Sequence, residues 1–128
     1  MSYYFNKTVE MPFDATRERV IAELQKEGFG VLTEIDVKAT LKKKLDVEFR
    51  NYRILGACNP PFAHQALLVE DKIGTMLPCN VIIQEQAAGL VEVAAIDPLA
   101  SMAAVNNPQL AEIGAQVRAR LQRVIENV

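Results

Sequence analysis

The residues of this chain best suited to chemistry are two Cys-Asn dipeptides, each flanked by a strand-like run and a proline. Cys58-Asn59 lies in the run ILGACNPP, and Cys79-Asn80 lies in the run MLPCNV. These dipeptides hold both cysteines of the chain, and its only histidine, His64, lies between them. A thiolate can act as a nucleophile or a soft-metal ligand, and a neutral imidazole can act as a base or a ligand. Any reaction or metal site is therefore expected around these segments.

A helix is predicted to begin directly after the first dipeptide. Asn59 precedes Pro60, and asparagine is a favoured N-cap residue while proline is preorganised for the first helical turn. The start of a helix carries unpaired backbone N–H groups and a partial positive charge. Because both features stabilise negative charge, we expect a thiolate at Cys58 or a bound anion at this helix start.

The predicted helix and the turn before the second dipeptide form one candidate site if they converge. Cys58, Cys79 and His64 would then share a pocket. Asn59 and Asn80 would donate amide hydrogens to a bound anion or carbonyl group. We therefore predict a site for a small-molecule ligand or an anion, made of these residues.

Three other interpretations of the same residues remain open. The cysteines can be purely structural, since free cysteine is often buried and packs as a small hydrophobe. A soft-metal protein would use Cys58, Cys79 and His64 for zinc or copper(I), but the chain lacks a Cys-x-x-Cys motif and a closed zinc site needs a fourth ligand. A thiol-dependent redox enzyme would pair Cys58 with His64 as its base. The sequence identifies neither a cofactor nor a catalytic residue, and no metal is predicted.

The elements that position these residues follow from hydrophobic periodicity and turn residues. Alternating apolar residues predict strands, and apolar residues at helical spacing predict helices. Strands are expected over residues 3–11, 29–35, 49–58, 81–86 and 90–96, and helices are expected to begin near residues 14, 36, 60, 98 and 108. The short spacing of the last two strands indicates a hairpin. This order predicts an α/β (α+β) fold, a two-layer sandwich whose partly antiparallel sheet has helices on one face.

Local signals define the ends of the first two helices. Asp14 and Asp36 are expected N-caps, because a carboxylate accepts hydrogen bonds from the first backbone N–H groups of a helix. Gly28 is expected in the left-handed conformation after the first helix, with Phe29 packing back on Leu24.

Composition and charge restrict the class of protein. The 128 residues fit a single domain over residues 1–128, half of the residues are hydrophobic, and the net charge is −2. This charge argues against non-specific nucleic-acid binding, which needs clustered positive charge. No apolar run reaches the ~20 residues of a membrane span, and the first residues do not resemble a signal peptide. We therefore expect a cytoplasmic protein with reduced cysteines, and a homo-oligomer, since symmetric homodimers are common.

Five segments in order resemble one known family. The segments are GFGV at 28–31, IDVK at 35–38, ILGACNP at 54–60, LPCNV at 77–81 and DP at 97–98. They are similar to the family called domain of unknown function 302, and the similarity extends from about residue 3 to 121. The resemblance implies a two-layer α/β sandwich likened to the TATA-binding-protein topology, without DNA binding, since function depends on sites rather than folds. It supplies no established activity. Asp46 stands where this family is expected to have glycine.

Overall fold

A single antiparallel sheet is the centre of the fold. The computed structural model describes residues 2–128, and its sheet has five strands in the order β1-β5-β4-β3-β2. Every neighbouring pair of strands is antiparallel, so the partly antiparallel sheet predicted from the sequence is antiparallel throughout. The strands are β1 (Tyr4–Val9), β2 (Gly30–Asp36), β3 (Tyr52–Cys58), β4 (Cys79–Ala87) and β5 (Leu90–Ile96). The hairpin predicted between the last two strands is β4–β5.

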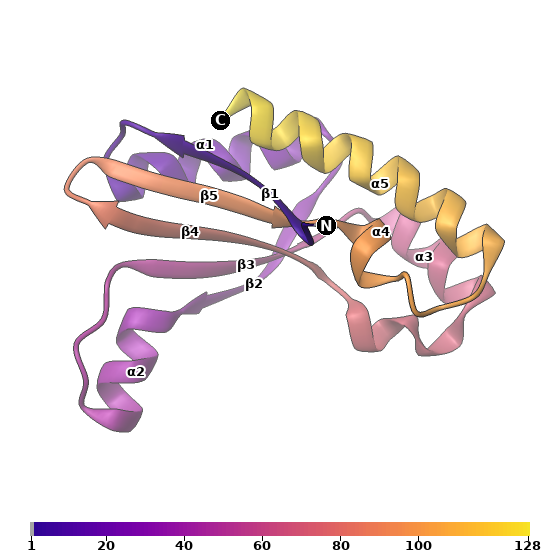
Figure 1. Cartoon of the computed structure of the whole chain (residues 1–128), viewed down its shortest axis with the longest axis horizontal. Helices are drawn as coiled ribbons and strands as arrows, with labels where there is room; N and C mark the ends of the chain where they lie inside the picture. Colours follow the sequence, from indigo (N-terminus) through magenta and orange to yellow (C-terminus); the bar gives the residue numbers. More distant parts are fainter. Residues whose placement is uncertain (1) are drawn as a thin grey trace.

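Helices form the second layer of the sandwich. α1 (Phe13–Lys26) and α5 (Pro108–Asn127) lie together over one face of the sheet (Figure 1). The remaining elements are α2 (Val37–Leu45), α3 (Pro60–Val69), the 3₁₀ helix η1 (Asp71–Met76) and α4 (Pro98–Ser101). α2 packs against β2 and β3, and α3 packs against η1 and α5 at the opposite end of the sheet. The two-layer α+β prediction is confirmed.

The core lies between the sheet and the two long helices, α1 and α5. Because successive strand residues point to opposite faces, alternate residues of each central strand enter the core. Fully buried side chains include Leu55, Val81, Ile83, Val91 and Val93 from the strands, and Val20, Leu24, Leu121 and Val124 from the helices. Burying each one contributes roughly 1.5–3 kcal/mol, so this layer holds the strand ends in place.

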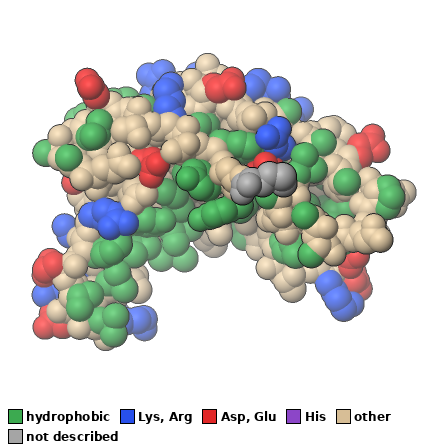
Figure 2. Space-filling model, in the orientation of Figure 1, with side chains coloured by type: hydrophobic (Ala, Val, Ile, Leu, Met, Phe, Trp, Pro, Cys, Tyr) green, Lys and Arg blue, Asp and Glu red, His purple; other side chains and the backbone are tan. Residues whose placement is uncertain are grey.

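The opposite face of the sheet is not covered by a helical layer. Its middle is an apolar row across four strands, in which Ala94 pairs with Ile82, Ile82 with Ile54, and Ile54 with Ile35. Ile35 at the end of the row is 47% exposed. Figure 2 shows hydrophobic side chains gathered in the hollow between the α2 end and the α3 end of the molecule. We call this surface the open face.

The helix-end signals are confirmed in part. Asp36 accepts a hydrogen bond from the Ala39 N–H at 2.9 Å, as an N-cap does. Asp14 is not the N-cap of α1, because the helix begins one residue earlier and Asp14 lies inside its first turn. There the Pro12 carbonyl accepts hydrogen bonds from both the N–H and the hydroxyl of Thr16.

Two residues take the left-handed backbone conformation, Gly28 as expected and Asp46 at the turn where this chain departs from the family's glycine. Gly28 has φ +86°, and the Phe29 N–H donates to the Leu24 carbonyl at 2.9 Å, with both of these side chains buried. Asp46 has φ +54°. The turn after α2 therefore keeps the conformation that favours glycine, although this chain carries aspartate there.

Edge strand β1 is held by its pairing with β5 and by a contact with the end of α5. It pairs with β5 along its whole length, from Tyr4 opposite Ile96 to Val9 opposite Val91. The Lys7 ammonium donates to the carbonyl oxygens of Glu126 and Val128 at 3.0 and 2.9 Å. A cation at the C-terminal end of α5 is favourable because unpaired carbonyls carry partial negative charge.

No helix within residues 2–128 has the length and apolarity needed to cross a membrane.

A partly exposed cluster of ion pairs joins α1 to the sheet. Glu34 on β2 lies 2.6 Å from Arg17 Nη2 and 2.6 Å from Arg53 Nη1. The hydrogen bond from Arg17 is the main reason that the pKa of Glu34 falls from 4.5 to about 2, with Arg53 adding to it and partial burial opposing it. Because the folded-state pKa is the lower one, the carboxylate stabilises the fold above pH 4.5, and this contribution is lost as the pH falls toward 2.

We predict that Glu34→Gln destabilises the fold at pH 7 by about 1 kcal/mol, since partial exposure screens the ion pairs. The difference in unfolding free energy from the wild type should shrink as the pH is lowered toward 2. Urea unfolding at a series of pH values measures it, and Glu112→Gln at an exposed position of α5 is the control. A difference independent of pH would contradict the role given to this carboxylate.

Gly56 is required by the close approach of two neighbours. A Cβ atom on Gly56 would lie 2.2 Å from Thr33 Oγ1 and 2.7 Å from Pro78 Cγ. Neither a β-branched side chain nor a proline ring can move away freely.

We predict that Gly56→Ala destabilises the protein by about 1–3 kcal/mol, the usual effect of overpacking. The control is Gly30→Ala, because Gly30 has nothing within 4 Å of the added Cβ and no positive φ. Equal melting temperatures for the two variants would show that Thr33 and Pro78 can move to make room for the added methyl group, and would contradict this prediction.

Candidate functional site

Three of the predicted residues meet at one pocket. Cys58, Asn59 and Cys79 line a pocket of about 280 Å³. They come together because β3 and β4 are antiparallel, with Ala57 directly opposite Cys79. The last residue of one strand therefore lies beside the first residue of the next. We call this the cysteine pocket.

The walls of the cysteine pocket are apolar. Side chains from β2, α3 and α5 and from the segments before β4 and after α4 surround the cysteines. The other lining residues are Phe29, Leu32, Ala57, Phe62, Ala63, Ala66, Leu67, Leu77, Pro78, Met102, Ile113, Gly114 and Val117. Four of these residues are alanine or glycine, which leaves the space unfilled. Leu32 and Leu67 are 67% and 43% exposed, so part of the pocket lining lies at the surface.

The two thiols differ in their surroundings. Cys58 is half-buried, whereas Cys79 is buried, and both are free thiols. Burial, and secondarily the nearby Cys58, raises the pKa of Cys79 to about 11. Cys79 therefore remains a neutral thiol at physiological pH and packs as a small hydrophobe, as in the structural interpretation of the cysteines.

Asn59 has a different role from the cap predicted for it. It occupies the N-cap position of α3, but its side chain makes no capping hydrogen bond. Its Nδ2 instead donates to the Glu27 carbonyl at 3.1 Å, and the Arg120 guanidinium donates to the same oxygen at 3.2 Å. Because Asn59 is only 8% exposed, its amide ties α3 to the end of α1 rather than facing solvent.

The start of α3 offers few donors to an anion. Pro60 and Pro61 occupy its first positions and have no N–H. The Ala63 N–H already donates to the Asn59 carbonyl at 3.0 Å. Only the Phe62 N–H is left in the first turn, so the anion part of the sequence-based prediction gains no support from this helix start.

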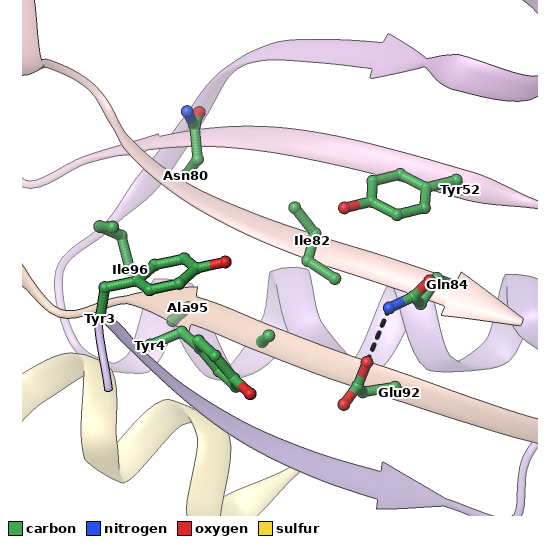
Figure 3. Close-up of a pocket in the computed structure, with 10 residues that line it drawn as sticks. Tyr3, Tyr4, Tyr52, Asn80, Ile82, Gln84, Glu92, Ala95 and Ile96 are labelled. Atoms are coloured by element: carbon green, nitrogen blue, oxygen red, sulfur yellow. Dashed lines mark hydrogen bonds between the residues drawn. The ribbon is translucent and has the colours of Figure 1, made fainter. Parts of the chain in front are cut away.

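The structure does not bring His64 and Asn80 to the cysteine pocket, and this corrects the predicted convergence. His64 is exposed on α3, while Ala63, Ala66 and Leu67 at helical spacing line the pocket. Asn80 follows Cys79 within a strand and therefore points to the opposite face of the sheet (Figure 3).

The soft-metal and thiol–base interpretations both depended on this convergence. Within residues 2–128 no cluster of three or more His, Cys, Asp or Glu side chains is placed to hold a metal ion. His64 does not line the cysteine pocket with Cys58, and no hydrogen bond within residues 2–128 joins the two, so the thiol–base interpretation gains no support.

Sequence reasoning missed the contribution of α5 and of the segment before it. Ile113 and Val117 belong to the apolar stripe of α5, and Met102 lies in the preceding turn. One available signal was Gly114, a glycine inside a long amphipathic helix. An added Cβ would make only ordinary contacts, with Leu99 at 3.5 Å and Met102 at 3.8 Å, so glycine leaves space beside these two side chains.

The fold and the pocket define an α+β protein with a five-stranded antiparallel sheet and an apolar site at one end of it. The family described as Domain of unknown function DUF302 matches residues 5–128. The crystal structure of an uncharacterized conserved protein DUF302 from Bacillus stearothermophilus is similar, with 28% sequence identity, 99% of this chain and 98% of that chain covered, and a TM-score of 0.92. The curated proteins gave no match. The chain belongs to the DUF302 family, as its segments predicted.

We predict that iodoacetamide at pH 8 labels Cys58 in the folded protein and labels Cys79 only after unfolding. The raised pKa of about 11 keeps Cys79 neutral, and burial blocks access to it. Because its folded pKa lies above the ordinary value of 9.0, any stability due to the neutral thiol is present below pH 9.0 and lost as the pH rises through 11. Peptide mass mapping measures both rates.

The Cys58→Ala variant isolates the second thiol in the same experiment. Rapid labelling of Cys79 in this folded variant would show that the thiol is accessible and would reopen thiol chemistry in the pocket.

Proposed function

We propose that this DUF302 protein binds a small, largely apolar molecule in the cysteine pocket. The observation that carries the proposal is the pocket of about 280 Å³ whose walls are apolar or small side chains, with Asn59 and the two thiols as its polar side chains. Ligand sites are typically concave, mostly apolar and provided with a few polar groups. An occupant would bury apolar surface, which contributes about 25 cal/mol per Å².

The polar groups at the pocket suggest what the ligand carries. The Asn59 Nδ2 is bonded to Glu27, and no hydrogen bond within residues 2–128 uses its Oδ1 as acceptor. A ligand with an N–H or O–H group can therefore donate to this oxygen. Thiols are weak hydrogen-bonding partners and tolerate apolar neighbours. A flat or compact apolar body with one donor matches this combination.

The cytoplasm is the proposed location of this activity. Both cysteines are free, and intracellular thiols are normally kept reduced.

Indole is a suitable probe because it is flat, apolar and carries one N–H donor. We predict saturable binding of indole, with a rise in melting temperature by linkage and shifts of pocket methyl resonances in NMR spectra. Benzofuran has the same shape without the donor, and it should bind several-fold more weakly, the effect of one missing hydrogen bond. Inorganic phosphate should give no response.

A pocket-filling variant tests where the probe binds. Ala63→Leu fills the cysteine pocket and should reduce indole affinity at least about tenfold. Ala119→Leu is the same substitution at an exposed position of α5 and should leave affinity unchanged. Undiminished binding to Ala63→Leu, or a response to phosphate without one to indole, would overturn the proposal.

A further inference from the structure

All three tyrosines of the chain line a second pocket, on the open face. This pocket has a volume of about 380 Å³, and Tyr3, Tyr4 and Tyr52 lie around it with Glu92. It lies on the face of the sheet opposite the helical layer, separate from the cysteine pocket. Figure 3 shows Tyr3 and Tyr52 directing their hydroxyls toward Ile82 from opposite sides, while the ring of Tyr4 extends toward the side of Glu92. We call this the tyrosine pocket.

Glu92 places a carboxylate in the wall of the tyrosine pocket. One oxygen of Glu92 accepts from Gln84 Nε2 at 2.7 Å, and the other accepts from Asn6 Nδ2 at 2.9 Å. Both donors are neutral amides, and no lysine or arginine within residues 2–128 forms an ion pair with Glu92. Each carboxylate oxygen has a further lone pair, so the group can accept hydrogen bonds from a ligand.

Arg50 orients Gln84 without forming an ion pair with Glu92. The Arg50 Nε donates to Gln84 Oε1 at 2.8 Å, which turns the Gln84 amide nitrogen toward Glu92. The Arg50 guanidinium lies 4.4 Å from the centre of the Phe49 ring and 5.7 Å from that of Tyr52. Aromatic rings at this end of the sheet therefore already attract a cation, while Glu92 is left with neutral partners.

We propose that the tyrosine pocket binds a small organic cation, an amine or quaternary ammonium attached to an apolar body. The cationic group would lie at Glu92, where it meets a carboxylate and the electron-rich faces of the tyrosines. The apolar body would lie on Ile82 and Ile96, which also line the pocket. This ligand supplies a positively charged partner for Glu92 and covers the apolar side chains of Ile82 and Ile96.

The same features argue against the other occupants of an uncovered sheet face. An anion would be repelled by Glu92. A second copy of this chain pressed onto the open face would bury Glu92 without an opposite charge, unless it brought a cation to that point, and a buried unpaired charge is costly. A small cation leaves no such unpaired group.

Tyrosine fluorescence reports this pocket directly. The chain has no tryptophan, and its three tyrosines all line this pocket. We expect phenethylammonium to change the fluorescence in a saturable manner. Its neutral counterpart 2-phenylethanol should bind at least about tenfold more weakly, and 3-phenylpropionate should not bind, because an ionic hydrogen bond is worth a factor of this size.

Variants locate the charge that is responsible. Glu92→Gln should weaken phenethylammonium binding about tenfold and remove the preference over 2-phenylethanol. Glu112→Gln, at an exposed position of α5, should change neither. Because Glu92 also accepts two hydrogen bonds, Tyr4→Leu is the second variant, and it should weaken binding several-fold through the lost aromatic face. Equal affinity for the cation and the alcohol, or full binding by both folded variants, would overturn the proposal.

Two further measurements separate this site from the others. Ala63→Leu fills only the cysteine pocket, so it should weaken indole binding as described above and leave the phenethylammonium response intact. Loss of both responses in the folded variant would place the two probes in one site and overturn the proposal. Sedimentation tests for a second copy on the open face. A dimer that Ile82→Asp dissociates, and that excludes phenethylammonium, would likewise overturn it.

Discussion

The antiparallel pairing of β3 and β4 is the constraint on which both pockets depend. It places the end of one strand beside the beginning of the other, with Ala57 opposite Cys79. The pleat then assigns consecutive residues to opposite faces, Cys79 toward the helices and Asn80 toward the open face. One dipeptide thus belongs to two chemically different surfaces. A shift of the register by one residue would exchange their contents.

The two faces of the sheet solve different packing problems. On the helical side, α1 and α5 bury the central strands, and space remains at the end where α3 meets α5 over small residues. On the open face, no helix within residues 2–128 covers the apolar row that contains Ile82 and Ile54. The amides of Asn80 and Gln84 and the carboxylate of Glu92 lie beside this row. The cysteine pocket is therefore a gap in the core, and the tyrosine pocket is a hollow in the surface. Their ligands are expected to differ accordingly.

Much of the fold was readable from the sequence, because its signals are local. The cap at Asp36, the left-handed Gly28 and the last hairpin depend on a few neighbouring residues. Whether the two cysteine segments meet was left open by the sequence, because local signals do not show which strands pair; the β3–β4 pairing settles it. The placement of Asn80 was missed because the strand was expected to begin at residue 81, so that Cys79 and Asn80 were both assigned to a turn. The role of Asn59 could not be predicted, since its partner, the Glu27 carbonyl, belongs to another helix end.

The position of β1 determines when the sheet can be completed. In the finished sheet this edge strand has β5 as its only strand neighbour, and β5 ends at Ile96. A ribosome releases the chain from its N-terminus, so β1 cannot pair with β5 until residues 90–96 have been synthesised. Polar residues on one side of β1, including Asn6 and Thr8, make the strand, while it is unpaired, less prone to pair with another chain and aggregate. Lys7 can reach its carbonyl partners on Glu126 and Val128 only after those residues have been synthesised, so β1 and the end of α5 come together late in folding.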